Sequence, residues 1–543
     1  MTRVMVVGAS GVFGSRLVEQ LAASLPVDLI LAGRHPEKAA VLMGRFEVFD
    51  RSRPDVARLK ELAPLVLIDA AGPFQNSSLV LPEACIAAGI TYIDLADARD
   101  FVARIPALDA AAKQAGVAVI SGASSTPALS HAVIDHFTAG WEHFDTILVA
   151  IAPGNRAPRG LSVVQAILSY VGRPLRLFRE GRWGEAPGWS CDEAVNFAGV
   201  GRRRVALCET PDLDLLVERY HPRVRAEFKA GLELGVLHHG LRLLSALRAH
   251  RLLPPLESLA RPLRAVAAAL DGFGSDTGGM LVRVTGLDGE NRARCITWSL
   301  AARSGIGPKV PVLPAVALVQ QLAAAGLEPG ARAAAGELRY EEVLNHLNRL
   351  GIDTQVTLED LGPPFQFEKA LGGAWATLPE ITRLIHTTAA SVVLEGAADI
   401  EGAETAAGRW LAKAFGFPEA GSNVPVRVVI ENDGPGERWA RQYPTRTMYS
   451  YMTNADQKRG TIEEHMGPFA FRLKLVGTAA GIDLVPDGWR YRWLALPNCL
   501  LPDIVASERA SADGRHLFDV RVALRPFGRL VHYRGWLRPA VPS

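Results

Sequence analysis

The chain has 543 residues, of which 48% are hydrophobic and 21% are charged. This length allows two or three domains with packed cores, and the composition excludes a disordered protein. The 59 basic and 57 acidic residues give a net charge of +2, so no overall field attracts nucleic acid, and we expect no nucleic-acid partner.

The cysteines and the apolar stretches of the sequence indicate in which cellular compartment the protein works. The five cysteines are widely spaced and form no C-x-x-C pair, which indicates neither a disulfide framework nor a zinc knuckle. Met1 to Gly8 leads directly into an apolar strand pattern without an export signal. Arginines interrupt Leu241 to Pro254 before it reaches the roughly 20 residues that span a bilayer. We therefore expect a cytoplasmic protein without a transmembrane segment.

Short apolar runs alternate with helical patterns over the first 125 residues. Val4 to Val7, Leu29 to Leu31 and Val66 to Ile68 are each followed by a helical segment. This alternation is typical of parallel βαβ units, so the sequence predicts an α/β, doubly wound Rossmann sheet. Mixed patterns after Gly122 predict an α+β middle section, and repeated strand-like runs from about Leu378 predict a separate, sheet-rich α+β C-terminal domain.

A glycine-rich loop stands between the first strand and the first helix. Gly8 allows a tight turn, Gly11 lets the backbone approach a pyrophosphate, and Gly14 lets helix and strand pack closely. A phosphate would then lie at a helix N-terminus, where free N–H groups favour an anion. The predicted cofactor-binding loop comprises Gly8, Ala9, Ser10, Gly11, Val12, Phe13 and Gly14.

Two further positions bear on the choice of nucleotide. About twenty residues beyond the loop, where NAD-binding proteins usually carry an acid, this chain has Arg34. A guanidinium suits a 2′-phosphate, so we expect NADP(H), with NAD(H) as the alternative. Arg34 could instead be a solvated residue at a helix start. Asp50 could reach the adenine side or be an exposed loop acid.

The fourth predicted strand ends in a run of small residues. The carboxyl edge of an open α/β sheet is where ligands bind, and small side chains there let a nicotinamide ribose lie against the backbone. The residues concerned are Ala71, Gly72, Pro73 and Phe74. A plain turn at the strand end is the alternative.

Together these motifs resemble the saccharopine dehydrogenase-like NADP-binding family. The resemblance rests on Gly8 to Gly14, Ala71 to Phe74 and the run Gly89-Ile90-Thr91-Tyr92-Ile93-Asp94, and more weakly on Gly305 to Pro308 and Gly330 to Tyr340. It covers roughly Met1 to Leu350. The C-terminal section, with Leu384-Ile385-His386 and Tyr533-Arg534-Gly535-Trp536-Leu537 among its motifs, resembles an uncharacterised domain often fused to such proteins.

The resemblance implies an organisation of the chain. The expected segments are an NADP-binding Rossmann domain (1–125), an α+β substrate or dimerisation domain (126–300), a helical return to the first domain (301–350), a linker containing Gly362-Pro363-Pro364 (351–377) and the C-terminal domain of unknown role (378–543). A homodimer is one expected assembly.

The resemblance also implies an activity. Some members of the family are oxidoreductases that transfer a hydride to the C=N bond of an opine-type substrate. Others resemble reductases that act on the C=C bond of an enoyl substrate. Where the family often has a glutamate after the Tyr-x-Asp segment, this chain has Asp97, which argues against an amino-acid substrate. The alternative function is a catalytically silent NADPH-binding sensor or a lipid-associated scaffold.

Three residues are the candidates for proton transfer. Asp94 shares a strand face with Tyr92, and that face could line the cofactor cleft or the packed interior. Asp97 follows the same strand. His131 is of a residue type suited to proton transfer, although a lone helical histidine is more often packed or solvated. His238-His239 lacks a metal-ligand partner, so we predict no metal site.

Two regions could contact apolar partners besides a small-molecule substrate. Leu241 to Ala269 mixes leucines with arginines, so one face could make a peripheral membrane contact or cover an apolar substrate; an ordinary amphipathic helix pair explains it as well. The aromatic-rich C-terminal strands, which contain a few arginines, could line a pocket for an apolar ligand with an anionic group, or be ordinary core and rim.

Overall fold

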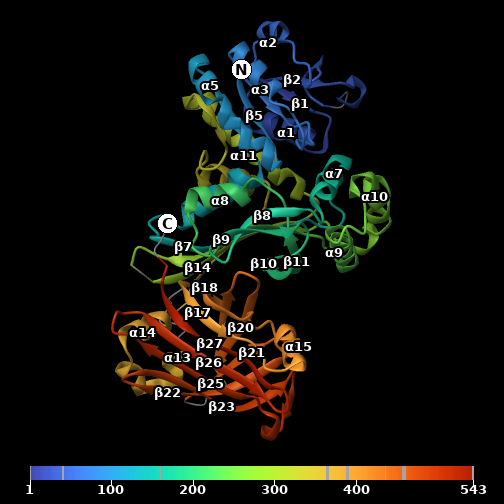
Figure 1. The fold of residues 1–543 in the computed structure, drawn as a ribbon. Coiled ribbons are helices and arrows are strands. Elements are labelled where there is room, and N and C mark those ends of the chain that lie inside the picture. Colours follow the sequence, from blue (N-terminus) through green and yellow to red (C-terminus); the bar gives the residue numbers. More distant parts are fainter. Residues whose placement is uncertain are drawn as a thin grey trace.

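The computed structural model describes residues 2–39, 42–158, 160–290, 292–361, 366–386, 391–433, 436–454 and 460–540. Its sheets follow one another along the molecule, with the N-terminal sheet at one end, a mixed sheet in the middle and a C-terminal barrel at the other end (Figure 1). The predicted α/β organisation with a separate sheet-rich C-terminal domain is confirmed.

The first sheet is parallel, in the order β15-β6-β5-β4-β1-β2-β3. Its strands are β1 (Thr2–Val7), β2 (Val27–Gly33), β3 (Arg45–Val48), β4 (Val66–Asp69), β5 (Thr91–Asp94), β6 (Ala118–Ser121) and β15 (Gly330–Ala333). The helices that connect them are α1 (Val12–Ser24), η1 (Pro36–Ala39), α2 (Val56–Leu62), α3 (Val80–Ala88), α4 (Arg99–Arg104), η2 (Ile105–Leu108) and α5 (Asp109–Ala115). Because helices cover both faces, central strands such as β4 are buried throughout, which explains their continuous apolar runs.

The middle sheet is mixed, in the order β10-β11-β12-β7-β13-β14-β16, and β8 and β9 form a hairpin beside β12. Its strands are β7 (His143–Ala152), β8 (Pro174–Arg179), β9 (Arg182–Pro187), β10 (Glu193–Phe197), β11 (Gly201–Leu207), β12 (Arg225–Gly231), β13 (Gly278–Leu287), β14 (Ala293–Ala302) and β16 (Asp353–Asp360). The helical elements around it are η3 (Ser125–Leu129), α6 (Ser130–Phe137), α7 (Leu161–Tyr170), α8 (Asp212–Tyr220), α9 (Gly235–Ala249), η4 (Leu256–Leu259), α10 (Ala260–Ala269), η5 (Asp271–Phe273), η6 (Gly307–Val312), α11 (Leu313–Ala325) and α12 (Tyr340–Arg349).

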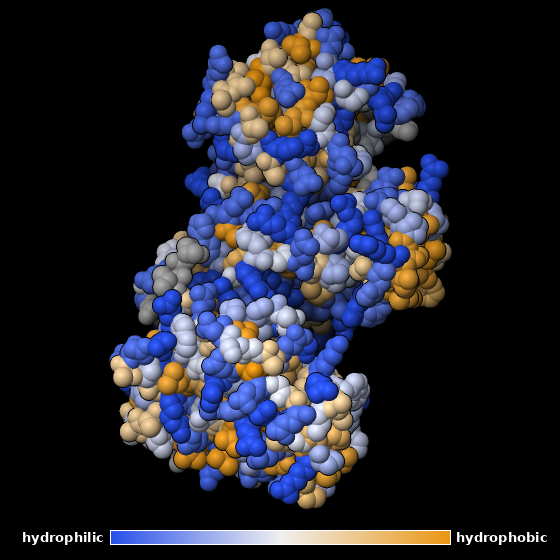
Figure 2. Space-filling model, in the orientation of Figure 1, coloured by the Kyte–Doolittle hydropathy of each residue, from blue (hydrophilic) through white to orange (hydrophobic). Residues whose placement is uncertain are grey.

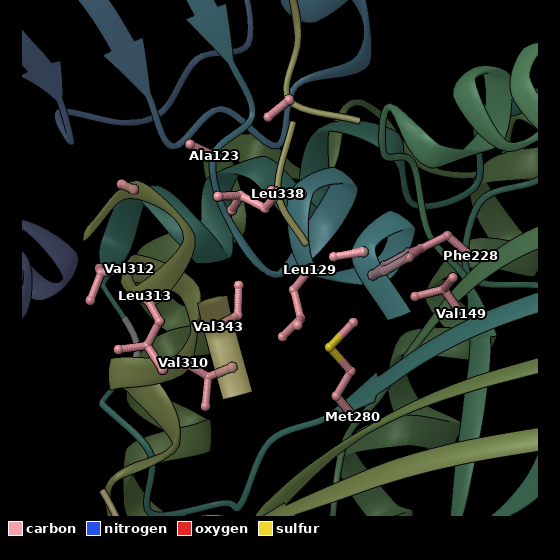
Figure 3. Close-up of a cluster of buried hydrophobic side chains, with 14 of the residues drawn as sticks. Ala123, Leu129, Val149, Phe228, Met280, Val310, Val312, Leu313, Leu338 and Val343 are labelled. Carbon is pink, nitrogen blue, oxygen red and sulfur yellow. The ribbon is translucent and has the colours of Figure 1, made fainter. Parts of the chain in front are cut away.

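One hydrophobic core joins the first sheet to the middle sheet. Leu129 from η3 and Leu313 from α11 lie in the same cluster of buried side chains as Val149 from β7 and Met280 from β13 (Figure 3). This cluster also contains strand residues of the first sheet, such as Val6. A shared, closely packed core fixes the two sheets relative to one another.

Part of the segment suggested as a linker is regular structure. β16 pairs with β14 at the edge of the middle sheet, and the helical elements α13 (Gln366–Leu371) and η7 (Gly372–Thr377) follow it. Gly362-Pro363-Pro364 lies outside the described residues.

The C-terminal strands form a closed antiparallel barrel. In the part of the chain that the structure describes, ten strands follow the order β22-β21-β20-β19-β18-β17-β27-β26-β25-β23, and β22 pairs with β23 to close the ring. They are β17 (Ser391–Glu401), β18 (Gly421–Asp433), β19 (Gly436–Gln442), β20 (Thr447–Asn454), β21 (Thr461–Met466), β22 (Phe469–Thr478), β23 (Gly481–Tyr491), β25 (Asp503–Ala510), β26 (His516–Leu524) and β27 (Gly528–Pro539). The strand β24 (Leu494–Leu496) pairs with β23, and α14 (Glu380–His386), α15 (Ala406–Ala414) and η8 (Asn498–Leu500) complete the domain.

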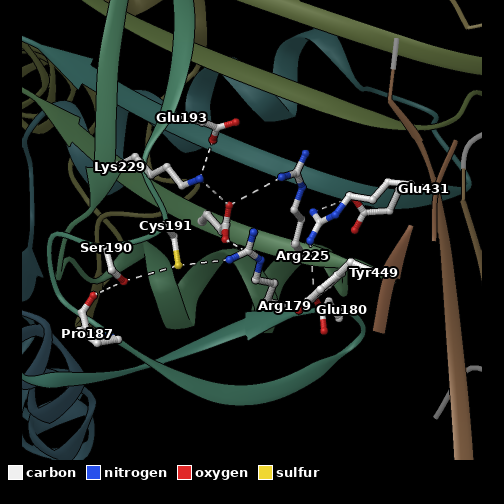
Figure 4. A network of polar contacts seen from close by, with 12 residues as sticks. Arg179, Glu180, Pro187, Ser190, Cys191, Glu193, Arg225, Lys229, Glu431 and Tyr449 are labelled. Atoms are coloured by element: carbon white, nitrogen blue, oxygen red, sulfur yellow. Dashed lines mark hydrogen bonds and ion pairs between the residues drawn. The ribbon is translucent and has the colours of Figure 1, made fainter. Parts of the chain in front are cut away.

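The outer face of β18, β19 and β20 contacts the middle sheet. Glu180, between β8 and β9, accepts hydrogen bonds from the Gln442 side-chain amide (2.8 Å) and from the Tyr449 hydroxyl (2.7 Å). Figure 4 shows this contact beside a network of buried charges that extends to Lys229 and Glu193 of the middle sheet. Polar side chains therefore attach the barrel to the middle sheet.

An apolar patch lies on the surface of α9, α10 and their connections. Val236, Leu243, Leu252, Val266 and Phe273 are each more than half exposed, with Phe273 at 79%. Figure 2 shows apolar side chains gathered over these helices. In the described part of the chain, no helix combines the length and the apolar character needed to cross a bilayer.

Candidate active site

A groove of about 600 Å³ lies at the carboxyl ends of β1, β2 and β4. Most of the predicted cofactor residues line it: Gly8, Ser10, Gly11, Val12, Phe13, Arg34, Asp50, Ala71, Gly72, Pro73 and Phe74. Ala9 and Gly14 are not in its wall. Ala9 belongs to the loop but is fully buried, and Gly14 lies in the first turn of α1.

The backbone of the loop requires glycine at two positions. Gly8 has a φ of +79°, and a Cβ atom there would lie 2.8 Å from the Cβ of Ala71. A Cβ on Gly14 would lie 2.1 Å from the Gly8 carbonyl oxygen. Gly11 caps α1 without a side-chain hydrogen bond, which leaves the first N–H groups of the helix free to bind an anion. The loop therefore fits a pyrophosphate.

Basic side chains gather at the other end of the groove. Arg34 and His35 follow β2 and line the groove beside Asp50. Hydrogen bonds from the Ser52 hydroxyl and backbone N–H hold the pKa of Asp50 below its usual value, and the charges of Arg34 and Arg53 add to this. Arg34 is exposed and free to meet a phosphate.

Arg51 is a groove residue that no sequence motif indicated. Its guanidinium forms an ion pair with Asp69 (2.9 Å), donates a hydrogen bond to the Ala71 carbonyl and lies 4.8 Å from the centre of the Phe74 ring. It thus fixes the loop that follows β4. The only signal in the sequence was its place next to Asp50, after β3.

A second cavity, of about 330 Å³, opens from the groove between the first sheet and the middle sheet. The residues that line both are Phe13, Gln75, Leu95, Asp97, Val163 and Ala166. Val163 and Ala166 belong to α7, which the sequence did not connect with the site. Asp97 is therefore placed where the two cavities meet.

The wall of the second cavity is mostly apolar, and its charges are all negative. Asp97, Glu209 and Asp276 line it, and none of its described wall residues is a lysine, arginine or histidine. Asp97 is exposed to the space of the cavities but surrounded by protein, so desolvation raises the pKa of its carboxyl, and hydrogen bonds, including one with Gln75, offset this only in part. Burial also raises the pKa of Glu209, against the opposing charge of Arg99.

Neutral polar groups complete the wall. The Tyr170 hydroxyl lies 2.7 Å from the Cys208 sulfur. Burial raises the pKa of Tyr170 well above its usual value and that of Cys208 to about 12, so both stay protonated near neutral pH. The side-chain hydroxyls of Thr126 and Thr210 are buried, and no residue in the described part of the chain forms a hydrogen bond with them. These groups can hold a substrate but do not ionise near neutrality.

Comparison with known proteins identifies the first domain. Residues 4–120 match the family described as Saccharopine dehydrogenase NADP binding domain. The N-terminal domain is a saccharopine dehydrogenase-type NADP-binding domain. Residues 378–537 match a domain of unknown function, DUF4166. Both resemblances predicted from the sequence are thereby confirmed.

Individual relatives agree with this assignment. The chain is 26% identical over 312 residues to carboxyaminopropylagmatine dehydrogenase of Synechocystis sp., an alignment that covers 51% of this chain and 76% of the relative. With the saccharopine dehydrogenase-type domain, this match identifies the chain as an oxidoreductase that binds a pyridine nucleotide.

Solved structures with a similar backbone were also found. Saccharopine dehydrogenase (L-Glu forming) from Saccharomyces cerevisiae has a TM-score of 0.48 and 13% identity, over 66% of this chain and all of that one. Amine dehydrogenase from Mycobacterium smegmatis has a TM-score of 0.33 and 13% identity, over 62% of this chain and 95% of that one.

Asp94 lies at the end of β5 in the saccharopine dehydrogenase-type domain but does not line either cavity. Its Oδ1 accepts hydrogen bonds from the backbone N–H groups of Ala96 (2.9 Å) and Gly122 (2.8 Å) and from the Ser121 hydroxyl (2.9 Å). Burial raises its pKa to about 7, against the lowering effect of these bonds. Asp94 therefore ties the ends of β5 and β6 together, and we do not propose it as a proton donor.

His131 is likewise fully buried and outside both cavities. Its Nε2 lies 3.5 Å from an Asp212 carboxylate oxygen, and its ring lies 5.3 Å from that of Tyr220. Both partners belong to α8, so His131 packs α6 against α8. Of the three residues suggested for catalysis, the structure brings only Asp97 to the cavities.

Proposed function

We propose that this protein is an NADP(H)-dependent oxidoreductase that reduces the C=N bond of an apolar, amine-derived substrate. One observation carries the proposal: a groove suited to a dinucleotide phosphate meets a largely apolar, acidic cavity at Asp97. The groove would hold the cofactor and the second cavity the substrate.

The residues of the groove suit each part of NADP(H). The Gly8 to Phe13 loop would hold the pyrophosphate at the N-terminus of α1, and Arg34 would pair with the 2′-phosphate. Ala71 to Phe74 would lie against the nicotinamide ribose, so that the ring reaches the junction of the two cavities. When bound, the cofactor supplies the hydride for the reaction.

Asp97 would act as the proton donor. Asp97 is exposed to the two cavities, where the surrounding protein raises the pKa of its carboxyl above the ordinary aspartate value and so favours its protonated form. Asp97 would give its proton to the nitrogen of a neutral imine and form an iminium, whose carbon would accept the hydride that the bound cofactor supplies; the product is an amine, and Asp97 is left as a carboxylate. Solvent then reprotonates Asp97. Glu209 would attract the positive charge of a protonated imine.

The sign of the charges favours C=N over C=C reduction. Reduction of a protonated imine consumes positive charge, whereas conjugate reduction of an enoyl substrate builds negative charge on its carbonyl oxygen. The acidic side chains of the cavity stabilise the positive charge that forms when a neutral imine is protonated, and they oppose the negative charge of the enoyl transition state. The absence of a basic residue among the described wall residues also argues against a carboxylate-bearing substrate at this position.

A substrate panel tests the proposal. Purified protein with NADPH is mixed with apolar aldehydes and ketones, each with and without an amine, and separately with enoyl thioesters. We expect NADPH oxidation only where an amine and a carbonyl compound are both present. Turnover of enoyl thioesters instead would contradict the C=N assignment, and NADPH binding without any turnover would support the alternative of a silent sensor.

We also propose that the apolar patch on α9 and α10 contacts an anionic membrane surface. Exposed Arg251, Arg261 and Arg264 flank the apolar side chains and complement anionic headgroups. α10 packs against α7, whose inner side lines the substrate cavity, so this contact would place the cavity close to apolar molecules in the membrane.

Vesicle sedimentation tests this contact. We expect the protein to sediment with vesicles that contain phosphatidylglycerol more than with pure phosphatidylcholine vesicles, and the variant Phe273→Asp with Leu252→Asp to stay in solution. Leu358→Asp, which changes an apolar side chain on β16 that is also more than half exposed, is the control and should sediment normally. Equal sedimentation of all variants would refute the assignment of this surface.

A further inference from the structure

The barrel encloses a cavity that is separate from the groove and the substrate cavity. Alternate residues of each strand point inward, as Val426 and Val428 of β18 do, while Arg427 points out to the middle sheet. The space left between them is about 150 Å³. In a barrel of about eight strands, side chains fill the interior. A ring of ten strands has a wider interior, which side chains do not readily fill.

The wall of this cavity is almost entirely apolar. Its aromatic members are Phe367, Phe415, Phe417, Trp439, Phe471, Trp489 and Phe518, and its aliphatic members include Val428, Met448, Met452, Leu473 and Ile504. Wall atoms that face an empty apolar space lose dispersion contacts, so an apolar occupant would be stabilised there.

Two hydroxyls in the wall are not used by the protein itself. Tyr443 and Tyr533 line the cavity and are buried, and no described residue forms a hydrogen bond with either hydroxyl. Burial raises the pKa of Tyr443 to about 12, against the lowering effect of Arg441, and raises that of Tyr533 as well. Both hydroxyls therefore stay protonated and can donate hydrogen bonds to a molecule in the cavity.

The charges in the wall are compensated. The guanidinium of Arg441 donates hydrogen bonds to the Ser450 hydroxyl (2.7 Å) and to Glu464 (3.3 Å). Glu508 lies 2.6 Å from His386 Nε2 and 3.6 Å from His516 Nε2. An ionic ligand would have to break one of these pairs without gaining a new partner for the group released.

We propose that the barrel is a binding site for a small, uncharged, mainly apolar molecule whose oxygen atom accepts hydrogen bonds from Tyr443 and Tyr533. This differs from the anionic ligand that the arginines of the sequence suggested, because Glu464 neutralises the arginine that faces the cavity. The proposal does not depend on the proposed reaction, since the barrel cavity shares no wall residue with the other two.

A fluorescence titration of the full chain tests the site. The probe is N-phenyl-1-naphthylamine, an uncharged apolar dye whose emission rises in apolar surroundings. We expect saturable binding of one dye per chain, displaced by 1-decanol but not by decanoate. Failure to bind the dye saturably would overturn the proposal. If decanoate displaces the dye as well as decanol does, the proposal that the ligand is uncharged would be overturned.

Variants locate the binding. Val428→Trp fills the cavity and should abolish dye binding, whereas Val476→Trp on the exposed side of β22 should not. Circular dichroism spectra and thermal transitions like those of the wild type, together with unchanged NADPH binding, would show that the barrel as well as the first two sheets is folded. Dye binding that persists in folded Val428→Trp would place the dye elsewhere and refute the proposal.

A second pair of variants covers the case in which the larger side chain prevents folding. Tyr443→Phe with Tyr533→Phe keeps the shape of the cavity but removes both donors, so decanol should displace the dye about two- to tenfold more weakly while the dye itself binds as before. Tyr491→Phe, outside the cavity wall, is the control. Equal displacement from all three proteins would refute the role of the hydroxyls.

Discussion

Arg34 is the residue on which the choice between NADP(H) and NAD(H) depends. NADH has no 2′-phosphate with which Arg34 could form a charge-assisted pair. Arg34→Ala should therefore raise the KM for NADPH about tenfold to a hundredfold and leave the KM for NADH nearly unchanged. Steady-state kinetics with both cofactors measure this. Arg45→Ala, at the exposed start of β3 and outside the groove, is the control, and an equal loss for both cofactors would contradict the assignment.

Asp97 can be tested through the pH dependence of turnover. Desolvation by the surrounding protein raises its pKa, so the carboxyl remains a donor above the usual range of an aspartate and kcat should fall as pH rises through that raised pKa. Asp97→Asn should lower kcat by about 10²- to 10⁴-fold and remove this limb of the profile. Asp100→Asn, outside both cavities, should keep the wild-type profile. A limb that survives in Asp97→Asn would assign the proton to another group.

At the scale of elements, the turn from β1 to α1 depends on close backbone approach. A Cβ on Gly14 would lie 2.1 Å from the Gly8 carbonyl oxygen, so Gly14→Ala must push α1 away from β1. We expect a loss of about 1–3 kcal/mol in the free energy of unfolding and much weaker NADPH binding, measured by denaturation and titration. Gly240→Ala, at a position in α9 where a Cβ meets no atom, should retain both properties. Normal NADPH binding by Gly14→Ala would refute the role of this turn.

In the barrel, Glu508 links α14 to β25 and β26. Burial by itself would raise the pKa of Glu508, but the charges of His386 and His516, the hydrogen bond with His386 and the charge of Arg441 outweigh it and lower the pKa to about 2. Because the folded pKa is below the ordinary 4.5, the stabilisation is present above about pH 4.5 and is lost as pH falls towards 2.

Glu508→Gln should therefore cost roughly 3–5 kcal/mol of unfolding free energy near neutral pH, since it removes one partner of a buried pair. The difference from wild type should shrink as the pH falls through that window, as urea denaturation at several pH values can measure. Glu395→Gln, which removes an exposed ion pair with Arg427, is the control with a small effect. A difference that does not change with pH would contradict this account of Glu508.

The elements that the sequence predicted well are those with local signals. The loop from Gly8 to Gly14 and the buried run of β4 follow from spacing and hydrophobicity alone. Arg51 and α7 reach the site only through tertiary packing, so no local pattern marked them. Asp94 and His131 carry suitable chemistry, but their backbone and core partners direct them away from the cavities.

At the scale of the whole molecule, the first sheet and the middle sheet act as one unit. Their common core holds the groove and the substrate cavity in a fixed relation, as hydride transfer requires. The barrel is attached through polar contacts at Glu180. Its closure could not be predicted, because it depends on the pairing of β17 with β27, which lie at opposite ends of the domain in the sequence. We propose that the chain divides as the sequence suggested except over 351–377, where β16 belongs to the middle sheet and α13 packs in the barrel. The homodimer stays a prediction that light scattering can test.

Isotope transfer tests the central claim most directly. NADPH deuterated at C4 of the nicotinamide is incubated with the protein, an apolar carbonyl compound and an amine, and the product is analysed by mass spectrometry. We expect one deuterium, on the carbon bonded to nitrogen in the product amine. Transfer into the carbon chain of an enoyl compound, or no transfer to any product, would contradict the reduction of a C=N bond at Asp97.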